Sequence, residues 1–216
     1  MTDPRFDHAM TATEFLSILE KDEDYQRRKR KADEEMAERR QVIAVASRPI
    51  LEDLRHVGYD VTSVYMLGSR YDSYPEALPI LMKHLEKGGY PDIVLDQMAR
   101  LMGVRYAEAY WDRIRALYDK YDDPSNDVVA QGLAVALGDS AKKDRFDDLV
   151  ELLRDQSHGQ SRVLFISPIL RIGRERGWVA IESVADDPVV GEEAKRSLHQ
   201  RELRRRAKVR REARGR

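Results

Sequence analysis

Arginine and tyrosine recur together in this sequence at a spacing that could build a binding surface. The stretch GSRY at 68–71 returns as GVRY at 103–106, so each arginine and each tyrosine has a counterpart 35 residues away. These residue types dominate protein-binding hot spots. The alternative is that each tyrosine packs between helices and each arginine pairs with a nearby acid. The candidates for partner contact are Arg70, Tyr71, Arg105, Tyr106, Tyr110 and Trp111.

The end of the chain is a second candidate binding segment, because its charge is strongly positive. Residues 196–216 contain ten arginines and lysines against two glutamates, whereas the net charge of the whole chain is −1. Clustered cations bind phosphates with a strong dependence on salt, so this tail could contact nucleic acid or an acidic protein surface. It could equally be a solubilising terminus, or fold back onto the acidic remainder of the chain. The candidate contacts are Arg201, Arg204, Arg205, Arg206, Lys208, Arg210 and Arg211.

A third charged stretch, RRKRK at 27–31, is predicted to be largely neutralised within its own helix. Four opposite-charge pairs have the i, i+4 spacing that stabilises a helix. They are Asp24/Arg28, Lys29/Asp33, Arg30/Glu34 and Lys31/Glu35. This pattern favours a solvated or coiled-coil-like helix. Apolar residues at its start could dock on the rest of the chain or on a second copy, which would make a homodimer; they are Phe15, Leu16, Ile18 and Leu19.

The residue types of common catalytic and metal sites are missing or scattered. The chain has no cysteine, which excludes thiolate catalysis, disulfides and the usual structural zinc sites. Its five histidines form no i, i+3 or i, i+4 pair, and GDSAKKD at 138–144 lacks the glycine pattern of a phosphate-binding loop. We therefore expect no catalytic residue, no metal and no cofactor.

Composition indicates long helices with solvated faces. Charged residues make up 36% of the 216 residues, well above the usual quarter, and only 12 glycines and 8 prolines interrupt them. No apolar run approaches the roughly 18 residues of a membrane span, and the polar start of the chain does not resemble a secretory signal. Together with the absence of cysteine, these features predict a cytoplasmic protein.

Four glycines separated by 35 residues indicate an internal repeat: Gly68, Gly103, Gly138 and Gly173. Apolar residues stand one, four and nine positions before each glycine, which places them on one stripe of an α-helix. Glycine adopts left-handed backbone conformations without steric cost, so each one is predicted to end an amphipathic helix. The four glycines are therefore expected in equivalent turns between repeats.

A second helix is predicted before each of the last three of these helices, at 75–89, 106–121 and 145–155. Turn-forming residues follow each one, and Asp123 before Pro124 is predicted to cap the next helix. The repeating unit is therefore helix, short turn, helix, glycine. One pair cannot bury its own apolar stripes, so neighbouring pairs must stack; the alternative is a non-repetitive helical bundle.

The two ends of the repeat are predicted to be looser than its middle. At the start, an imperfect pair is expected at 42–57 and 59–67, with Pro49 breaking or kinking its first helix. At the end, a shortened pair is expected within 176–198. The predicted organisation is a charged extension at 1–41 with one long helix from residue 13, a repeat domain at 42–199 and a basic tail, flexible or helical, at 200–216.

The repeat resembles a known family. DDPSNDVVAQGLAVALGDSAKKDRFDDLVELLRD at 122–155 and DDPVVGEEAKRSL at 186–198 are similar to HEAT repeats, notably the short HEAT-like repeats of the phycobilisome-lyase type. The resemblance covers roughly residues 42–199. It implies an all-α fold, a right-handed α-solenoid of about four to five helix pairs, with the second helix of each pair on the concave side. Most such arrays are binding surfaces.

Two kinds of enzyme share this architecture, and the sequence argues against both. HEAT-like metal hydroxylases bind iron through His-Glu dipeptides, and here no histidine is followed by glutamate. HEAT-like DNA glycosylases use an aspartate and tryptophans in a basic cleft, types supplied here by Trp111, Asp112 and Trp178. The acidic body of this chain does not suit a DNA cleft. Packing of both tryptophans between helices is therefore favoured.

These observations predict a non-catalytic scaffold or adaptor that presents a solenoid surface to a protein partner. The alternative is an accessory protein that contacts nucleic acid through the basic tail.

Overall fold

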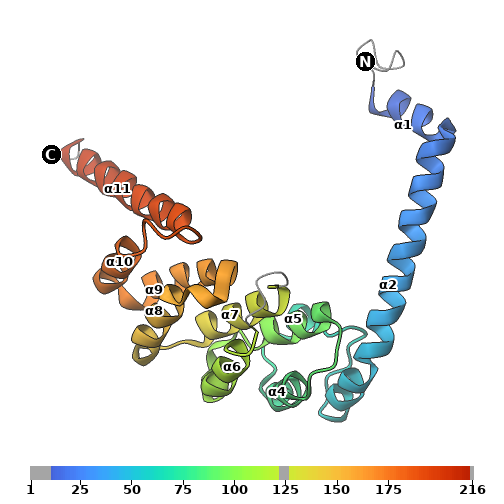
Figure 1. The fold of residues 1–216 in the computed structure, drawn as a ribbon, viewed down its shortest axis with the longest axis horizontal. Helices are drawn as coiled ribbons and strands as arrows, with labels where there is room; N and C mark the ends of the chain where they lie inside the picture. The colour runs from blue at the N-terminus through green and yellow to red at the C-terminus, as the bar shows by residue number, and fades with distance from the viewer. Residues whose placement is uncertain (1–10, 122–126, 215–216) are drawn as a thin grey trace. The chain divides into compact units, whose positions relative to one another are not determined.

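The computed structural model describes residues 11–121 and 127–214, and the regular structure within these ranges is entirely helical (Figure 1). The all-α prediction is therefore confirmed, whereas the cap predicted at Asp123 and Pro124 lies outside the described residues. The chain divides into two compact units, Met1–Val45 and Ala46–Arg216. None of the helices in the described ranges is long and apolar enough to cross a membrane.

The first unit contains α1 (Ala12–Lys21) and most of α2 (Glu23–His56). The prediction of one helix over 13–41 is wrong, because the chain breaks at Asp22. Its carboxylate accepts a hydrogen bond from the backbone N–H of Tyr25 at 2.9 Å, which caps the start of α2. Beyond this cap, every residue from 27 to 42 is exposed.

Helix α2 then continues to His56, so the separate helix predicted at 42–57 does not exist and Pro49 does not end it. A proline inside a helix removes one backbone hydrogen bond, and the freed carbonyl must find another partner. Pro49 is exposed, so water can reach this part of the helix. The opposite face of α2 buries Ser47, Ile50 and Leu54 in the second unit, which holds the helix in place.

The second unit continues with nine α-helices in its described residues. Their bounds are α3 (Met66–Arg70), α4 (Leu78–Lys87), α5 (Asp92–Leu101), α6 (Trp111–Tyr118), α7 (Val128–Ser140), α8 (Phe146–Arg154), α9 (Ile166–Gly173), α10 (Glu175–Glu182) and α11 (Gly191–Arg214). Helices α4, α6 and α8 confirm the helices predicted at 75–89, 106–121 and 145–155. Tighter 3₁₀ turns lead into four helices: η2 (Pro75–Ala77), η3 (Arg105–Tyr110), η4 (Lys143–Arg145) and η5 (Gln156–Phe165).

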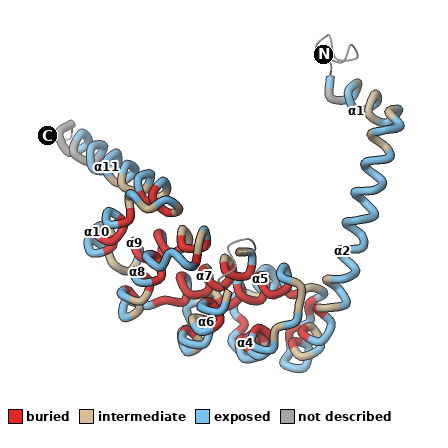
Figure 2. The backbone as a smooth tube through the Cα atoms, in the orientation of Figure 1, coloured by how far each residue is buried: buried red, intermediate tan, exposed pale blue. Residues whose placement is uncertain are grey.

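Helix α7 is the centre of the second unit. Nine of its residues are buried, and it packs against α5, α6 and η5 (Figure 2). Its approach to α5 is close: a Cβ added at Gly132 would lie 2.9 Å from the backbone oxygen of Asp96. The indole N–H of Trp111 at the start of α6 donates to the carbonyl of Leu137 at 3.1 Å. These contacts fix the helices that carry the candidate surfaces.

The four repeat glycines do not lie in equivalent left-handed turns, so that prediction is wrong. Gly68 and Gly138 are inside α3 and α7, Gly173 is the last residue of α9, and Gly103 follows the end of α5. Positive φ angles occur instead at Gly58, Gly88, Gly89 and Gly159. The turn-based argument for the repeat therefore fails.

Close approach between successive helices explains two of the four glycines. An added Cβ at Gly68 would lie 3.0 Å from Leu101 Cδ2 of α5, and one at Gly138 would lie 2.6 Å from Pro168 Cγ of α9. At Gly103 the nearest atom would be the backbone oxygen of Arg100 in the preceding turn at 2.9 Å, whereas Val135 Cγ1 of α7 would lie at an ordinary contact distance of 3.5 Å. Each glycine thus faces the next odd-numbered helix along the chain. At Gly173 an added Cβ would instead overlap the ring of Phe146 on α8.

The last helix pair differs from the preceding ones in length. Helix α10 has eight residues, as α6 does, but α6 continues the 3₁₀ turn η3 whereas α10 begins directly after Arg174, so the first helix of the last pair is shorter, as predicted. Helix α11 has 24 residues and extends far beyond the predicted end at 198. The basic tail is therefore helical as far as Arg214.

Candidate binding surfaces and polar clusters

The two arginine–tyrosine stretches make different contacts. Arg70 is exposed at the end of α3, and the ring of Tyr71 meets that of Tyr59 edge to face, with centroids 4.9 Å apart. The Tyr71 hydroxyl accepts a hydrogen bond from the backbone N–H of Asp60 at 3.2 Å. In the first stretch, the arginine is thus accessible while the tyrosine packs against the preceding segment.

In the second stretch, the tyrosine joins two neighbouring helix pairs. Tyr106 is 41% exposed, and its hydroxyl accepts a hydrogen bond from the backbone N–H of Tyr74 at 3.0 Å. Tyr74 is buried and donates to the carbonyl of Leu101 at 3.0 Å. Burial raises the pKa of Tyr74 to about 12. Tyr74 and Tyr106 therefore contact neighbouring helix pairs, in agreement with the alternative that tyrosines pack between helices. Arg105, next to Tyr106 in the sequence, is exposed.

Trp111 is a core residue, which corrects its assignment as a partner contact. Its side chain is 2% exposed, is hydrogen bonded to Leu137, and is covered by the guanidinium of Arg145 at 4.3 Å from the ring. The neighbouring Tyr110 is half-buried, with Arg113 at 5.5 Å from its ring. Asp112 pairs with Arg145 at 2.9 Å. The tryptophan and aspartate considered for a glycosylase cleft are thus engaged in packing and in an ion pair.

Arg105 does line a hollow of about 630 Å³, which we call the basic hollow. Three further cations contribute from the end of α7, from η4 and from α9. The full lining is Arg105, Ser140, Ala141, Lys142, Lys143, Asp144, Arg171 and Ile172. Of these lining residues, only Arg105 was predicted from the sequence as a candidate contact. The two lysines that follow α7, Lys142 and Lys143, were the sequence feature that could have identified the rest of this basic cluster.

Internal contacts hold two of the four cations of the basic hollow. Lys142 pairs with Glu108, and Arg171 donates to the carbonyl of Gly138 at 2.6 Å. Arg105 and Lys143 are exposed at its rim. All four cations are exposed, and they face one aspartate, Asp144, in the same lining, so the hollow suits a ligand that carries carboxylates.

The tail candidates lie on α11, where a hollow of about 590 Å³ is lined mainly by arginines. We call it the arginine groove; its lining is Glu182, Leu198, Arg201, Glu202, Arg205, Arg206 and Arg210. Arg206 pairs with Glu202, and Arg201 pairs with Glu175 while lying 4.7 Å from the ring of Trp178. Arg204 and Arg211 are exposed on other parts of the helix; Lys208 lies in α11, but its side chain is not among those described.

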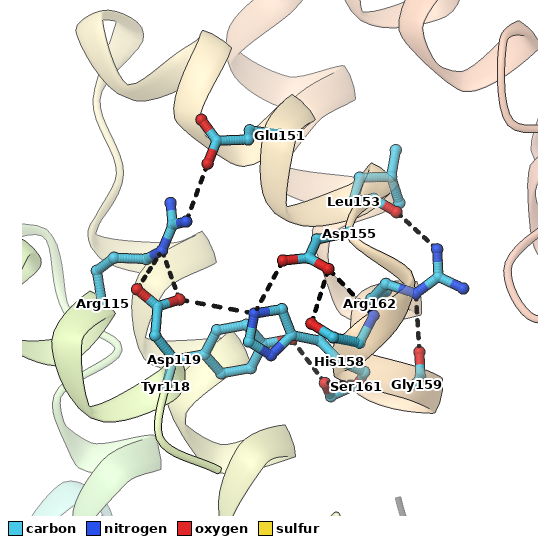
Figure 3. A network of polar contacts seen from close by, with 11 residues as sticks. Arg115, Tyr118, Asp119, Glu151, Leu153, Asp155, His158, Gly159, Ser161 and Arg162 are labelled. Carbon is cyan, nitrogen blue, oxygen red and sulfur yellow. Dashed lines mark hydrogen bonds and ion pairs between the residues drawn. The ribbon is translucent and has the colours of Figure 1, made fainter. Parts of the chain in front are cut away.

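A buried polar network around His158 connects α6, α8 and η5 (Figure 3). The imidazole is 4% exposed and stacks on the ring of Tyr118, with centroids 4.1 Å apart. Its Nε2 lies 3.6 Å from carboxylate oxygens of both Asp119 and Asp155, and its buried Nδ1 has no hydrogen-bond partner among the described residues. Burial lowers the pKa of His158, against the attraction of the two carboxylates.

Arg162 anchors the other side of this network. The side chain is completely buried and donates to both carboxylate oxygens of Asp187 at 3.0 Å, to the carbonyl of Leu153 at 3.0 Å and to that of Gly159 at 3.1 Å. These bonds hold the pKa of Asp187 far below its ordinary value. The network therefore joins the last helix pair to the one before it.

A second buried histidine, His84, lies between a carboxylate and a hydroxyl. Its Nε2 is 3.0 Å from Asp53 Oδ2 of α2, and its Nδ1 is 2.6 Å from the Tyr90 hydroxyl. The geometry orients the imidazole as in a catalytic relay, but its side chain is 4% exposed and the hollows described above are lined by other residues. The contact ties α2 to α4.

The pattern of ionisable side chains gives no metal site within the described ranges: three or more histidines, aspartates or glutamates do not converge there. Exposed charged side chains therefore lie beside the basic hollow and the arginine groove. The buried polar side chains His84, His158 and Arg162 instead form contacts that join helices. Comparison of the chain with protein-family models, with curated proteins and with solved structures gives no match.

Proposed function

We propose that the chain is a non-catalytic cytoplasmic scaffold that binds an acidic segment of a protein partner in the basic hollow. The observation that carries this proposal is the convergence of Arg105, Lys142, Lys143 and Arg171 on one hollow of a chain whose net charge is −1. A local cluster of cations on an otherwise balanced surface attracts and orients an anionic partner.

We further propose that the helix pairs stack as a right-handed α-solenoid of the HEAT-like type. Alternating helices support it, since α5 packs on both α4 and α7, and α7 packs on α6 and α9. Gly68, Gly103 and Gly138 each face the next odd-numbered helix, with close approaches at Gly68 and Gly138. In such an array the basic hollow lies between adjacent pairs, where loops are free to vary without loss of the core.

A charge-reversal experiment tests the basic hollow. The probe is a fluorescein-labelled polyglutamate peptide, and binding is measured by anisotropy. The variant Arg105→Glu with Lys143→Glu reverses two cations of the hollow and leaves the contacts of Lys142 and Arg171 in place, while Arg48→Glu with Lys120→Glu is a matched reversal at exposed positions elsewhere. We expect the hollow variant to weaken binding at least about tenfold, which corresponds to about 1.4 kcal/mol. Equal affinity of the two variants would refute the proposed surface.

A second candidate function is nucleic-acid binding through α11, favoured by the arginine groove. The exposed Arg204, Arg205 and Arg210 extend over about two turns of this helix. If this function is correct, binding to a labelled duplex or single strand falls steeply with salt and is lost when 200–216 are deleted. Binding that survives the deletion would exclude α11 as the contact.

A further inference from the structure

A third hollow, of about 430 Å³, lies beside α9, and we call it the apolar groove. One wall is formed by η5, α9 and α10, and the other by α11. Five apolar side chains line the first wall: Val163, Leu164, Ile166, Leu170 and Trp178. All of them except Ile166 are half-buried, so apolar surface stays open to solvent here. A hollow lined by apolar side chains with a few polar groups is the usual form of a binding site.

The second wall is part of the packed unit. Ala194, near the start of α11, is completely buried. Further along this helix, the guanidinium of Arg201 lies 4.7 Å from the ring of Trp178 and pairs with Glu175. These contacts hold α11 along the groove, so its side chains have defined places opposite the apolar wall.

Positive charge dominates the wall that α11 provides. Its charged lining residues are Arg196, Arg201, Arg204 and Glu193. The first arginine pairs with Glu192 and Glu193, and the second pairs with Glu175. Arg204 is exposed and has no ion-pair partner among the described residues. An anionic group that follows the apolar wall would therefore meet an unpaired cation.

The basic hollow and the apolar groove border the same helix. Arg171 of α9 lines the basic hollow, whereas Ile166, Ser167 and Leu170 of α9 line the apolar groove. At 3.6 residues per turn and 1.5 Å per residue, positions 167 and 171 lie about 40° apart around the helix and about 6 Å apart along it. Both side chains are exposed. A bound chain can therefore pass from one hollow to the other over this strip of α9.

We propose that the apolar groove receives a large apolar side chain from the same acidic segment whose carboxylates bind in the basic hollow. This inference rests on the proposed function and specifies the partner's segment further. Cations lie on both sides of the apolar wall: Arg171 donates to Gly138 of α7 on one side, and Arg204 lies on α11 on the other. A peptide with acidic residues around a leucine matches this order. A fatty acid does not, because it carries one anion at one end.

The width of α9 sets the spacing within the segment. A helix with its side chains is about 10–12 Å across, and an extended chain advances about 3.4 Å per residue. The apolar residue is therefore expected three or four positions from the carboxylates that enter the basic hollow. Acidic residues directly beyond it then reach Arg204.

Two labelled peptides of equal charge test the groove by fluorescence anisotropy. Their sequences are EEEEGSLLEE and EEEEGSSSEE, so they differ only in the apolar side chains. We expect the parent chain to bind the leucine peptide at least about fivefold more tightly, because burial in the groove removes leucine from water. The chain has two tryptophans, and Trp111 is buried. A change in tryptophan emission with the leucine peptide alone therefore reports contact with Trp178.

Substitution of Leu170 should abolish the preference for leucine. Leu170→Gln is expected to bind the two peptides alike, and to bind the serine peptide as the parent does. Val179→Gln is the matched control, because Val179 is an apolar residue of α10 that is 68% exposed and lines none of the three hollows. Thermal unfolding verifies that both variants are folded.

Reversal of Arg204 tests the other wall without disturbing the packing, since this side chain is exposed. Arg204→Glu should weaken binding of the leucine peptide more than Arg210→Glu does. Arg210 is exposed on the same helix but lines the arginine groove instead. Equal effects of the two reversals would contradict the placement of the segment against Arg204.

The outcomes separate this inference from the proposed function. Suppose that the two peptides bind the parent equally, and that Arg105→Glu with Lys143→Glu weakens both. The apolar groove is then refuted while the basic hollow stands. Failure of both peptides to bind the parent would refute the basic hollow and this inference with it.

Other results would identify a different occupant or a different contact. A preference for leucine that persists in Leu170→Gln would place the apolar contact elsewhere. A change in Trp178 emission with dodecanoate, but not with the leucine peptide, would identify a lipid. Self-association of the parent that Leu170→Gln abolishes, measured by sedimentation velocity, would identify a second copy of the chain. Each of these results would overturn the proposal.

Discussion

At the scale of single residues, the buried Arg162 is the charge on which the last helix pair depends. Its removal in Arg162→Met leaves Asp187, whose side chain is 9% exposed, without its ion-pair partner and with hydrogen bonds from the backbone N–H groups of Val189 and Val190. An uncompensated buried charge of this kind costs about 3–5 kcal/mol, and we expect a loss of that size in the free energy of unfolding by urea. The exposed pair Arg176–Asp147 is the matched control, and Arg176→Met should cost less than about 1 kcal/mol. Similar losses in both variants would contradict this role.

His158 is expected to make the second unit sensitive to mild acid. Burial, opposed by Asp155 and Asp119 and reinforced by Arg115 and Arg162, lowers its pKa from the ordinary 6.5. Between the folded pKa and 6.5, the unfolded chain binds a proton that the folded chain does not. The free energy of unfolding should therefore fall as the pH is lowered through this range.

Comparison with His158→Phe isolates this contribution. Phenylalanine keeps a ring stacked on Tyr118 and does not titrate, so the slope of stability against pH below 6.5 should become shallower. Unfolding by urea at a series of pH values measures it, with His56→Gln at an exposed position as the control. An unchanged slope in His158→Phe would disprove the assignment.

At the scale of secondary-structure elements, the distance to the neighbouring helix determines how much a glycine-to-alanine substitution destabilises the protein. Gly138→Ala should destabilise the protein by about 1–3 kcal/mol, because its Cβ would lie 2.6 Å from the rigid ring of Pro168. Gly68→Ala is the matched comparison, since its Cβ would lie 3.0 Å from the flexible end of Leu101. Alanine also favours helix by up to about 1 kcal/mol, so this variant should be nearly neutral. Thermal unfolding checks the order, and a more damaging Gly68→Ala would reverse the argument.

At the scale of the whole molecule, the two compact units are expected to be separable in stability. The buried residues of α2 are Ser47, Ile50 and Leu54, all of them within the second unit. A chain that starts at residue 42 keeps them and loses only exposed helix and α1. We expect its free energy of unfolding by urea to change by less than about 1 kcal/mol. A large loss of stability would place part of the core before residue 42.

The sequence by itself determined the helical fold class and the approximate places of α4, α6 and α8. Helix formation leaves a period of 3.6 residues along the chain, so the positions of apolar residues reveal it without knowledge of neighbours. The charge order of α2 is also fully visible in the sequence. The sequence predicted the ends of helices less well than their middles. The break at Asp22 depends on one capping hydrogen bond, and the continuation of α2 past Pro49 depends on which face of the helix is exposed.

Only the tertiary structure decided which side chains meet. Gly138 was predicted as a left-handed turn and is a point of close approach to Pro168. Trp111 was both a candidate partner contact and a candidate for packing between helices, and the structure buries it against Leu137. Arg105 and Lys143 are far apart in the sequence but line one hollow. Partners some 30 residues away depend on how one helix pair docks on the next. The docking of one pair on the next depends on side-chain packing throughout the second unit. The spacing of apolar residues within one helix does not reveal this packing.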